Sequence, residues 1–202
     1  MATPTKNLLK LTGGWLMLWE VVKVVGLALI IVIVVKHFLF QPFYVKGASM
    51  EPNYQDHEYL IIDELSYRFH EPHRGDVVVF HYPADETQYF IKRVIGFPGE
   101  HVAVHDGHVW INDTQLDESA YLASDVATIG TTDLTVPAGS FFLMGDNRPA
   151  SLDSRIFGPV ARKEIVGRTW VRAWPLSRMT HFTTPSYPTT TALVPNLLTY
   201  AS

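Results

Sequence analysis

A serine and a lysine in two short segments could together form a nucleophile and its base. Ser49 lies in the segment 46–52, which reads KGASMEP, and Lys92 lies in the segment 89–99, which reads YFIKRVIGFPG. A serine hydroxyl is a weak nucleophile until a base removes its proton. A lysine amine that is neutral because it is shielded from water can be that base without histidine or aspartate. The pair therefore predicts an enzyme.

The residues around Lys92 favour such shielding. In a β-strand, side chains alternate between faces, so Phe90, Lys92 and Val94 share one face while Arg93 points its like charge away. Apolar neighbours disfavour the ammonium and lower a lysine pKa from its ordinary value of about 10.4. The alternative is a lysine whose stem lies on the sheet and whose charged end stays in water.

The residues before Ser49 are small. Gly47 and Ala48 leave room for a substrate backbone, and the Ser49 amide could donate to an oxyanion. The alternative is a structural serine in a turn before Pro52.

A third segment, 145–158, reads GDNRPASLDSRIFG. Taken alone, it is typical of a turn after a buried strand, with Asp153 and Arg155 as a surface ion pair of little energetic value. The three segments in this order, behind an apolar N-terminal stretch, resemble the bacterial type I signal peptidases. These are membrane-bound Ser-Lys proteases that cut secretory signal peptides from exported proteins. The resemblance covers the chain from about Phe40 to Pro175.

The resemblance implies roles for individual residues. Ser49 is the nucleophile and Lys92 the general base, and no cofactor is implied. Ser151 matches the serine that hydrogen-bonds the catalytic lysine, Asp153 and Arg155 match an ion pair that shapes the site, and Asp146 matches the acidic residue of that segment. Gly47 occupies the position where more distant members often carry a serine as a second oxyanion donor. Substrate pockets are expected to be lined by Phe43, Val45, Met50, Tyr54, Tyr89 and Ile91.

Composition limits the other classes of function. The 202 residues suffice for one sizeable domain plus an anchor, and the absence of cysteine excludes disulfides, thiolate zinc sites and a cysteine nucleophile. A formal net charge of −4 gives no basic surface for a nucleic acid.

The apolar stretch predicts a membrane anchor over residues 15–40. Residues 24–35 carry no polar side chain, and the stretch reaches the roughly 20 residues that a bilayer needs if it includes Glu20, which can pair with Lys23. Trp15 and Trp19 suit the membrane interface.

Lys6 and Lys10 favour a cytoplasmic N-terminus, with the remaining chain outside the cell. A cleaved signal peptide is disfavoured, because residues 38–42 are bulky where a cut site needs small residues. A buried soluble helix is the other alternative.

Beyond Pro42 the pattern is mainly β, and we expect an antiparallel-sheet, signal peptidase-like domain. Asp106-Gly107 predicts the tight turn of a hairpin. The tail is rich in Thr and Pro, which is typical of poor order. The expected parts are a cytoplasmic segment 1–14, the anchor 15–40, a peptidase domain 41–175 and a poorly ordered tail 176–202. Strands are expected in the segments 59–62, 76–80, 89–95, 101–112, 141–144 and 166–172.

Other mechanisms have less support. His70 and His73 resemble a metal-ligand pair, but Pro72 prevents the helix that would align them, so no metal site is predicted. The residues around Ser49 match neither the nucleophile elbow nor the Ser-x-x-Lys signature.

The sequence thus predicts a membrane-bound serine endopeptidase that cleaves signal peptides after a small-x-small motif. Its expected partners are secretory preproteins, the lipid bilayer and, as a further candidate, the secretion machinery, with no nucleic acid. Two alternatives remain open: a Ser-Lys peptidase dedicated to one export or pilus substrate, and a non-catalytic membrane-tethered peptide-binding protein.

Overall fold

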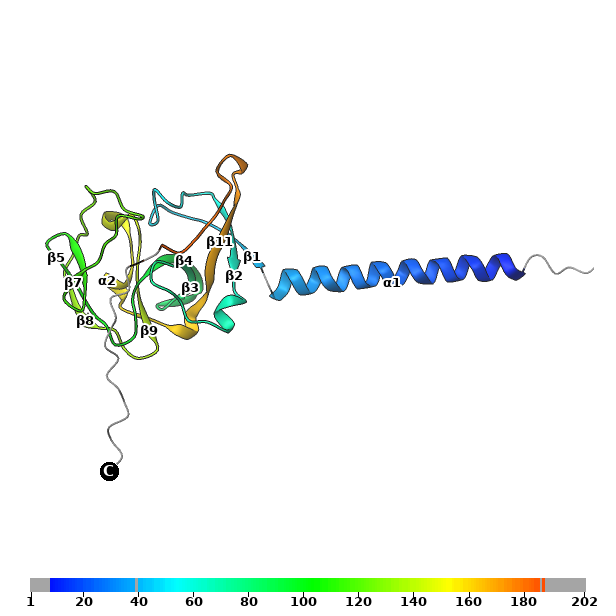
Figure 1. Ribbon diagram of the computed structural model, residues 1–202, viewed down its shortest axis with the longest axis horizontal. Coiled ribbons are helices and arrows are strands. Elements are labelled where there is room, and N and C mark those ends of the chain that lie inside the picture. The colour runs from blue at the N-terminus through cyan, green and yellow to red at the C-terminus, as the bar shows by residue number, and fades with distance from the viewer. Residues whose placement is uncertain (1–7, 39, 186, 188–202) are drawn as a thin grey trace, which may run out of the picture.

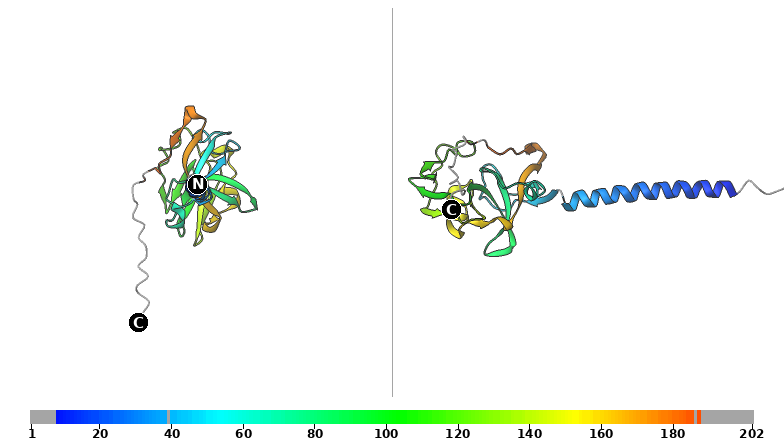
Figure 2. Two further views of the ribbon diagram at one scale, coloured as in Figure 1. Left: turned by 90° about the vertical axis from the view of Figure 1, so that its right-hand side faces the viewer. Right: turned by 60° about the horizontal axis from the view of Figure 1, so that its bottom comes forward.

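A single long helix precedes a β-rich body in the computed structural model, which describes residues 8–38, 40–185 and 187. Helix α1 (Leu8–Phe38) has 31 residues, so it is about 46 Å long at the usual rise per residue. Its segment Gly14–Val32 is long and apolar enough to cross a membrane, and none of that segment is buried by the rest of the chain. Figures 1 and 2 show the helix projecting away from the body. The expected contact between Glu20 and Lys23 is present at 2.7 Å.

The larger of two antiparallel sheets has the strand order β1-β2-β11-β3-β4-β9-β10, with β12 paired to β11. The apolar and β-branched residues of the central strands suit a sheet that is covered on both faces. Its strands are β1 (Phe40–Tyr44), β2 (Tyr59–Asp63), β3 (Val77–Tyr82), β4 (Asp85–Gly96), β9 (Ser140–Met144), β10 (Val160–Ala161), β11 (Ile165–Trp174) and β12 (Thr180–His181).

The smaller sheet has the order β7-β6-β5-β8 and lies at the end of the body opposite α1 (Figure 1). Its strands are β5 (His101–His105), β6 (His108–Ile111), β7 (Thr114–Gln115) and β8 (Thr132–Thr135). The turn between β5 and β6 has φ of 53° at Asp106 and 79° at Gly107, so the predicted hairpin is confirmed. Val102 and Val104 of this sheet share one core with Phe142 of β9.

Short helices fill the connections between the strands. They are η1 (Ser66–Arg68), η2 (Arg148–Ala150), α2 (Ser154–Phe157), η3 (Arg162–Glu164) and η4 (Leu176–Arg178).

The expectation of a poorly ordered tail from residue 176 is corrected for residues 176–185. Strand β12 pairs with β11, and the Phe182 ring stacks on Tyr54 with centroids 4.5 Å apart. Tyr187 packs against the core that the two sheets share. Apolar contacts thus outweigh the disorder-prone composition of this segment. The rest of the expected tail lies outside the described residues.

A buried ion pair links β4 to the segment that follows β9. The Arg93 guanidinium donates from Nε and Nη2 to the two carboxylate oxygens of Asp146, at 2.7 and 2.6 Å. Asn53 Nδ2 also donates to Asp146 at 2.8 Å. Both charged side chains are removed from water, so each depends on the other.

We expect Asp146→Ala to lower the free energy of unfolding by about 3–5 kcal/mol, because it leaves the buried Arg93 charge without its partner. The measurement is chemical unfolding in detergent, monitored by tryptophan fluorescence. Asp133→Ala is the matched control, because Asp133 pairs with His101 on the surface and is 82% exposed. Equal changes in the two variants would contradict the prediction.

Candidate active site

Ser49 lies in the loop between β1 and β2, just beyond the point where their ladder ends. The Val45 N–H donates to Glu58 O at 2.8 Å, and the His57 N–H donates to Val45 O at 3.0 Å, so the pairing extends to the start of the loop. Gly47 then turns the chain with φ of 97°, a conformation that favours glycine. Met50, only 1% exposed, anchors the loop in the core.

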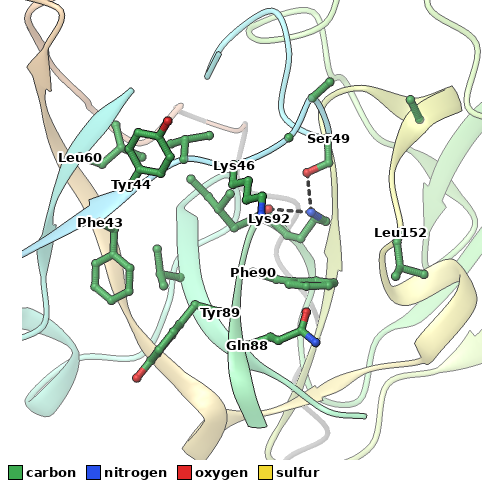
Figure 3. Close-up of a pocket in the computed structure, with 16 residues that line it drawn as sticks. Phe43, Tyr44, Lys46, Ser49, Leu60, Gln88, Tyr89, Phe90, Lys92 and Leu152 are labelled. Carbon is green, nitrogen blue, oxygen red and sulfur yellow. Dashed lines mark hydrogen bonds between the residues drawn. The ribbon is translucent and has the colours of Figure 1, made fainter. Parts of the chain in front are cut away.

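Lys92 extends from β4 to the same place. It pairs with Val78 of β3 in the middle of the larger sheet and is 3% exposed. Its Nζ lies 2.7 Å from Ser49 Oγ and 2.8 Å from Ile91 O. Figure 3 shows the two side chains pointing toward one another at the edge of a cleft.

The surroundings of Lys92 weaken its charged form. Desolvation by burial lowers the pKa of Lys92 from 10.5 to about 8, although the charges of Asp153 and Asp146 oppose this shift. The Phe90 ring centroid lies 5.3 Å from Nζ, on the face predicted by the alternation. Arg93 points to the other face, where Asp146 binds it. A neutral amine is thus accessible near neutral pH, within reach of a serine hydroxyl.

The segment after β9 packs against the Ser49 loop and holds a buried ion pair near Lys92. The Gly145 N–H donates to Asp153 Oδ2 at 3.0 Å, and Arg155 Nη2 lies 2.7 Å from the same oxygen. Burial alone would raise the pKa of Asp153, but the bonds from Arg155 and Gly145 outweigh it and hold that pKa below its ordinary value. The ion pair expected from the sequence is therefore present, and it is largely buried instead of lying on the surface.

Gly145 is a site residue to which the sequence analysis gave no role. A Cβ at this position would lie 2.1 Å from Ser151 Oγ and 2.4 Å from Ser49 O, so only glycine allows the two segments to approach this closely. The available signal was a glycine directly after a buried strand.

Ser151 lies beside Gly145 and is 9% exposed. Within the described part of the chain, Lys92 Nζ donates to Ser49 and Ile91 and not to Ser151. Ser151 is therefore near the pair but does not form the hydrogen bond that the resemblance implies.

A cleft of about 490 Å³ opens beside Ser49 and Lys92. Four of the six side chains expected to bind substrate line it: Phe43, Val45, Tyr89 and Ile91. The sequence analysis did not assign several further lining residues, which come from β1 to β4, from the loop after β1 and from the segment after β9. These are Tyr44, Lys46, Leu60, Val79, Gln88, Phe90, Ala150 and Leu152.

The expectation that Met50 and Tyr54 line the cleft is corrected. Both are buried in the core between the loop and the sheet, and the Tyr54 hydroxyl bonds Thr169 at 2.8 Å. Met50 is apolar and Tyr54 finds a partner for its hydroxyl, so the core can hold both. Their packing in the core holds the Ser49 loop against the sheet.

Comparison with known proteins assigns the chain to a family. Residues 18–174 match the family described as signal peptidase, peptidase S26. The chain is 38% identical over 170 residues to signal peptidase I from Leptolyngbya laminosa, covering 80% of this chain and 82% of that protein. It is 30% identical over 173 residues to signal peptidase IB from Staphylococcus aureus, covering 78% and 90%.

Among solved structures, a signal peptidase I from Enterococcus faecalis is 33% identical to the chain. It covers 49% of this chain and 97% of its own, with a TM-score of 0.43. The family match and the curated relatives extend over most of the chain. The chain therefore belongs to the signal peptidase family, peptidase S26, and its activity is the cleavage of signal peptides.

Proposed function

We propose that Ser49 is the nucleophile of this signal peptidase and that Lys92 is its general base. The observation that carries the proposal is the 2.7 Å contact between Lys92 Nζ and Ser49 Oγ at the edge of the cleft. The pKa of Lys92, lowered to about 8 by desolvation, supports a neutral amine that can accept a proton.

The reaction follows from this contact. As Ser49 Oγ attacks the carbonyl carbon of the scissile peptide bond, Lys92 Nζ takes the hydroxyl proton and becomes an ammonium. It then gives that proton to the leaving amine, which departs as the new N-terminus and leaves an ester on Ser49. Lys92, neutral again, next takes a proton from water, whose oxygen attacks the ester carbon. The Lys92 ammonium then gives that proton to Ser49 Oγ as the C–O bond breaks, which frees the signal peptide with its new carboxyl terminus and restores the pair. Backbone amides, including that of Ser49, stabilise the oxyanion in both steps.

The substrate is an extended segment that ends in a small-x-small motif. Strand β1 is an edge strand, and β4 pairs with β9 only from Arg93 onward, so the 88–92 edge of β4 is open to a further strand. Main-chain hydrogen bonds to these edges give affinity, and shallow apolar pockets exclude large side chains.

The apolar helix α1 serves as a membrane anchor. We assign residues 15–40 to the anchor and 41–175 to the peptidase domain, with the N-terminus cytoplasmic and the peptidase domain outside the cell. Lys6 and Lys10 support this orientation. In this arrangement the site lies at the membrane surface, where the apolar part of a preprotein signal is already inserted. Secretory preproteins are the proposed substrates.

We expect Ser49→Ala and Lys92→Ala each to lower kcat/KM for a preprotein with an Ala-x-Ala site by at least about 10⁴-fold, because each removes one half of the pair. The full-length protein in detergent is incubated with the preprotein, and mass spectrometry identifies the new N-terminus.

Ser124→Ala and Lys163→Ala are matched controls, because both side chains are exposed and lie outside the cleft. We expect both to cleave at the wild-type rate. Cleavage that survives Ser49→Ala would refute the assigned nucleophile. A panel of unrelated preproteins separates a general peptidase from one dedicated to a single substrate.

We expect kcat/KM to rise with pH and to reach half of its maximum near pH 8, because the active form carries a neutral Lys92 whose pKa is about 8. Below this value the ammonium form dominates, so kcat/KM falls about tenfold per pH unit. The measurement is initial cleavage rates of a short peptide between pH 6 and pH 10. A constant rate across this range would be inconsistent with lysine as the base.

A further inference from the structure

The reaction proposed for Ser49 requires that its backbone N–H point at the developing oxyanion. A donor of this kind acts only if its direction is fixed before the reaction begins. Met50 anchors the chain after Ser49 in the core, but Gly47 and Ala48 before it are small and offer little packing. The Ala48–Ser49 peptide, which carries the Ser49 N–H, lies on this less packed side, so hydrogen bonds to it are important for its direction.

Asn147, two residues after Gly145, contacts both peptide groups that flank the Ser49 Cα. Its side-chain Nδ2 donates to Ala48 O at 3.0 Å, and its backbone N–H donates to Ser49 O at 3.1 Å. One residue from a distant part of the chain thus restrains the loop on both sides of the nucleophile.

The bond to Ala48 O bears directly on the Ser49 N–H. The two groups belong to one planar trans peptide, in which C=O and N–H point in opposite directions. Holding the carbonyl therefore fixes the direction of the N–H. The Glu51 N–H also donates to Ala48 O, at 3.1 Å, but it lies within the same turn and moves with it. Asn147 instead ties the peptide to the segment held by Asp153.

The position of Asn147 in its own helix supports a role outside that helix. It is the N-cap of η2, a position where an asparagine side chain ordinarily accepts a bond from the first turn. Here the side chain makes no capping bond and extends to Ala48. The Ser49 N–H donates to no backbone carbonyl within residues 40–185, so it is available to a substrate oxygen.

We propose that Asn147 is a positioning residue that orients the Ser49 amide as an oxyanion donor. This inference rests on the proposed role of Ser49. An amide is the suitable group because it donates, whereas a carboxylate of the same shape would repel the carbonyl oxygen. The effect should be on the transition state more than on substrate binding.

The test compares Asn147→Ala and Asn147→Asp with the wild type, using the full-length protein in detergent and a peptide with an Ala-x-Ala site. We expect kcat to fall about 10- to 100-fold in both variants, somewhat less than when a donor is removed outright, while KM changes less than about threefold. The thermal midpoint and the pH at half-maximal kcat/KM of Asn147→Ala should match the wild type. Asn112→Asp is the matched control, because Asn112 is exposed in the turn between β6 and β7 and its Oδ1 acceptor is retained.

A peptide aldehyde provides a second readout. Ser49 Oγ adds to the aldehyde carbon, and the aldehyde oxygen then occupies the place of the oxyanion. The inhibition constant of the aldehyde should therefore rise in parallel with the loss of kcat/KM. A kcat within about twofold of the wild type in Asn147→Ala would overturn the inference, as would a loss confined to KM. Cleavage by Ser49→Ala would overturn the proposed nucleophile and this inference with it. Inactive Ser49→Ala together with fully active Asn147→Ala would overturn this inference alone.

Discussion

The site depends above all on the desolvation of the Lys92 ammonium. Burial lowers the pKa of Lys92 to about 8, while the carboxylates of Asp146 and Asp153 act in the opposite direction. Each carboxylate is itself bound by an arginine, Asp146 by Arg93 and Asp153 by Arg155. Burial outweighs the two paired carboxylates, because the net shift of the Lys92 pKa is downward. The two carboxylates can therefore hold the segment after β9 in place without cancelling the effect of burial on Lys92.

Strand β4 explains how one side chain can be buried and yet reach a substrate. Its middle is covered on one edge by β3, and only its end from Arg93 onward pairs with β9. Lys92 directly precedes Arg93, so it lies where the part of β4 that is paired on both edges meets the part that is paired on one. The Phe90 ring centroid lies 5.3 Å from Lys92 Nζ, and Ser49 of the loop between β1 and β2 contacts the same nitrogen at 2.7 Å. The same strand thus provides a buried environment for Lys92, the proposed base, and an open backbone edge beside it.

Local patterns in the sequence were enough to predict the apolar helix, the central strands and the hairpin turn at Asp106-Gly107. The residue types of Ser49 and Lys92 suggested a nucleophile and its base, and the resemblance to a family supported the pairing, but no local pattern reports a contact between residues that are 43 positions apart. Met50 and Tyr54 were misplaced because the resemblance implied a pocket for both, and it does not separate a residue that lines the cleft from one that packs beneath the loop. The order of residues 176–185 was missed because composition does not reveal that Phe182 has Tyr54 to stack upon.

The loop that carries Ser49, the proposed nucleophile, is held by several contacts on the side away from the cleft. A peptidase that accepts an extended chain must leave the substrate side of its nucleophile bare, which here requires small residues at Gly47 and Ala48. Small residues contribute no packing, so the loop is held from below by Met50 and from behind by the segment that contains Gly145. The close approach at Gly145 is the counterpart of the openness at Gly47. A Cβ at Gly47 would meet no atom within 4 Å, whereas a Cβ at Gly145 would lie 2.4 Å from Ser49 O, so the loop is open on one side of Ser49 and closely packed on the other.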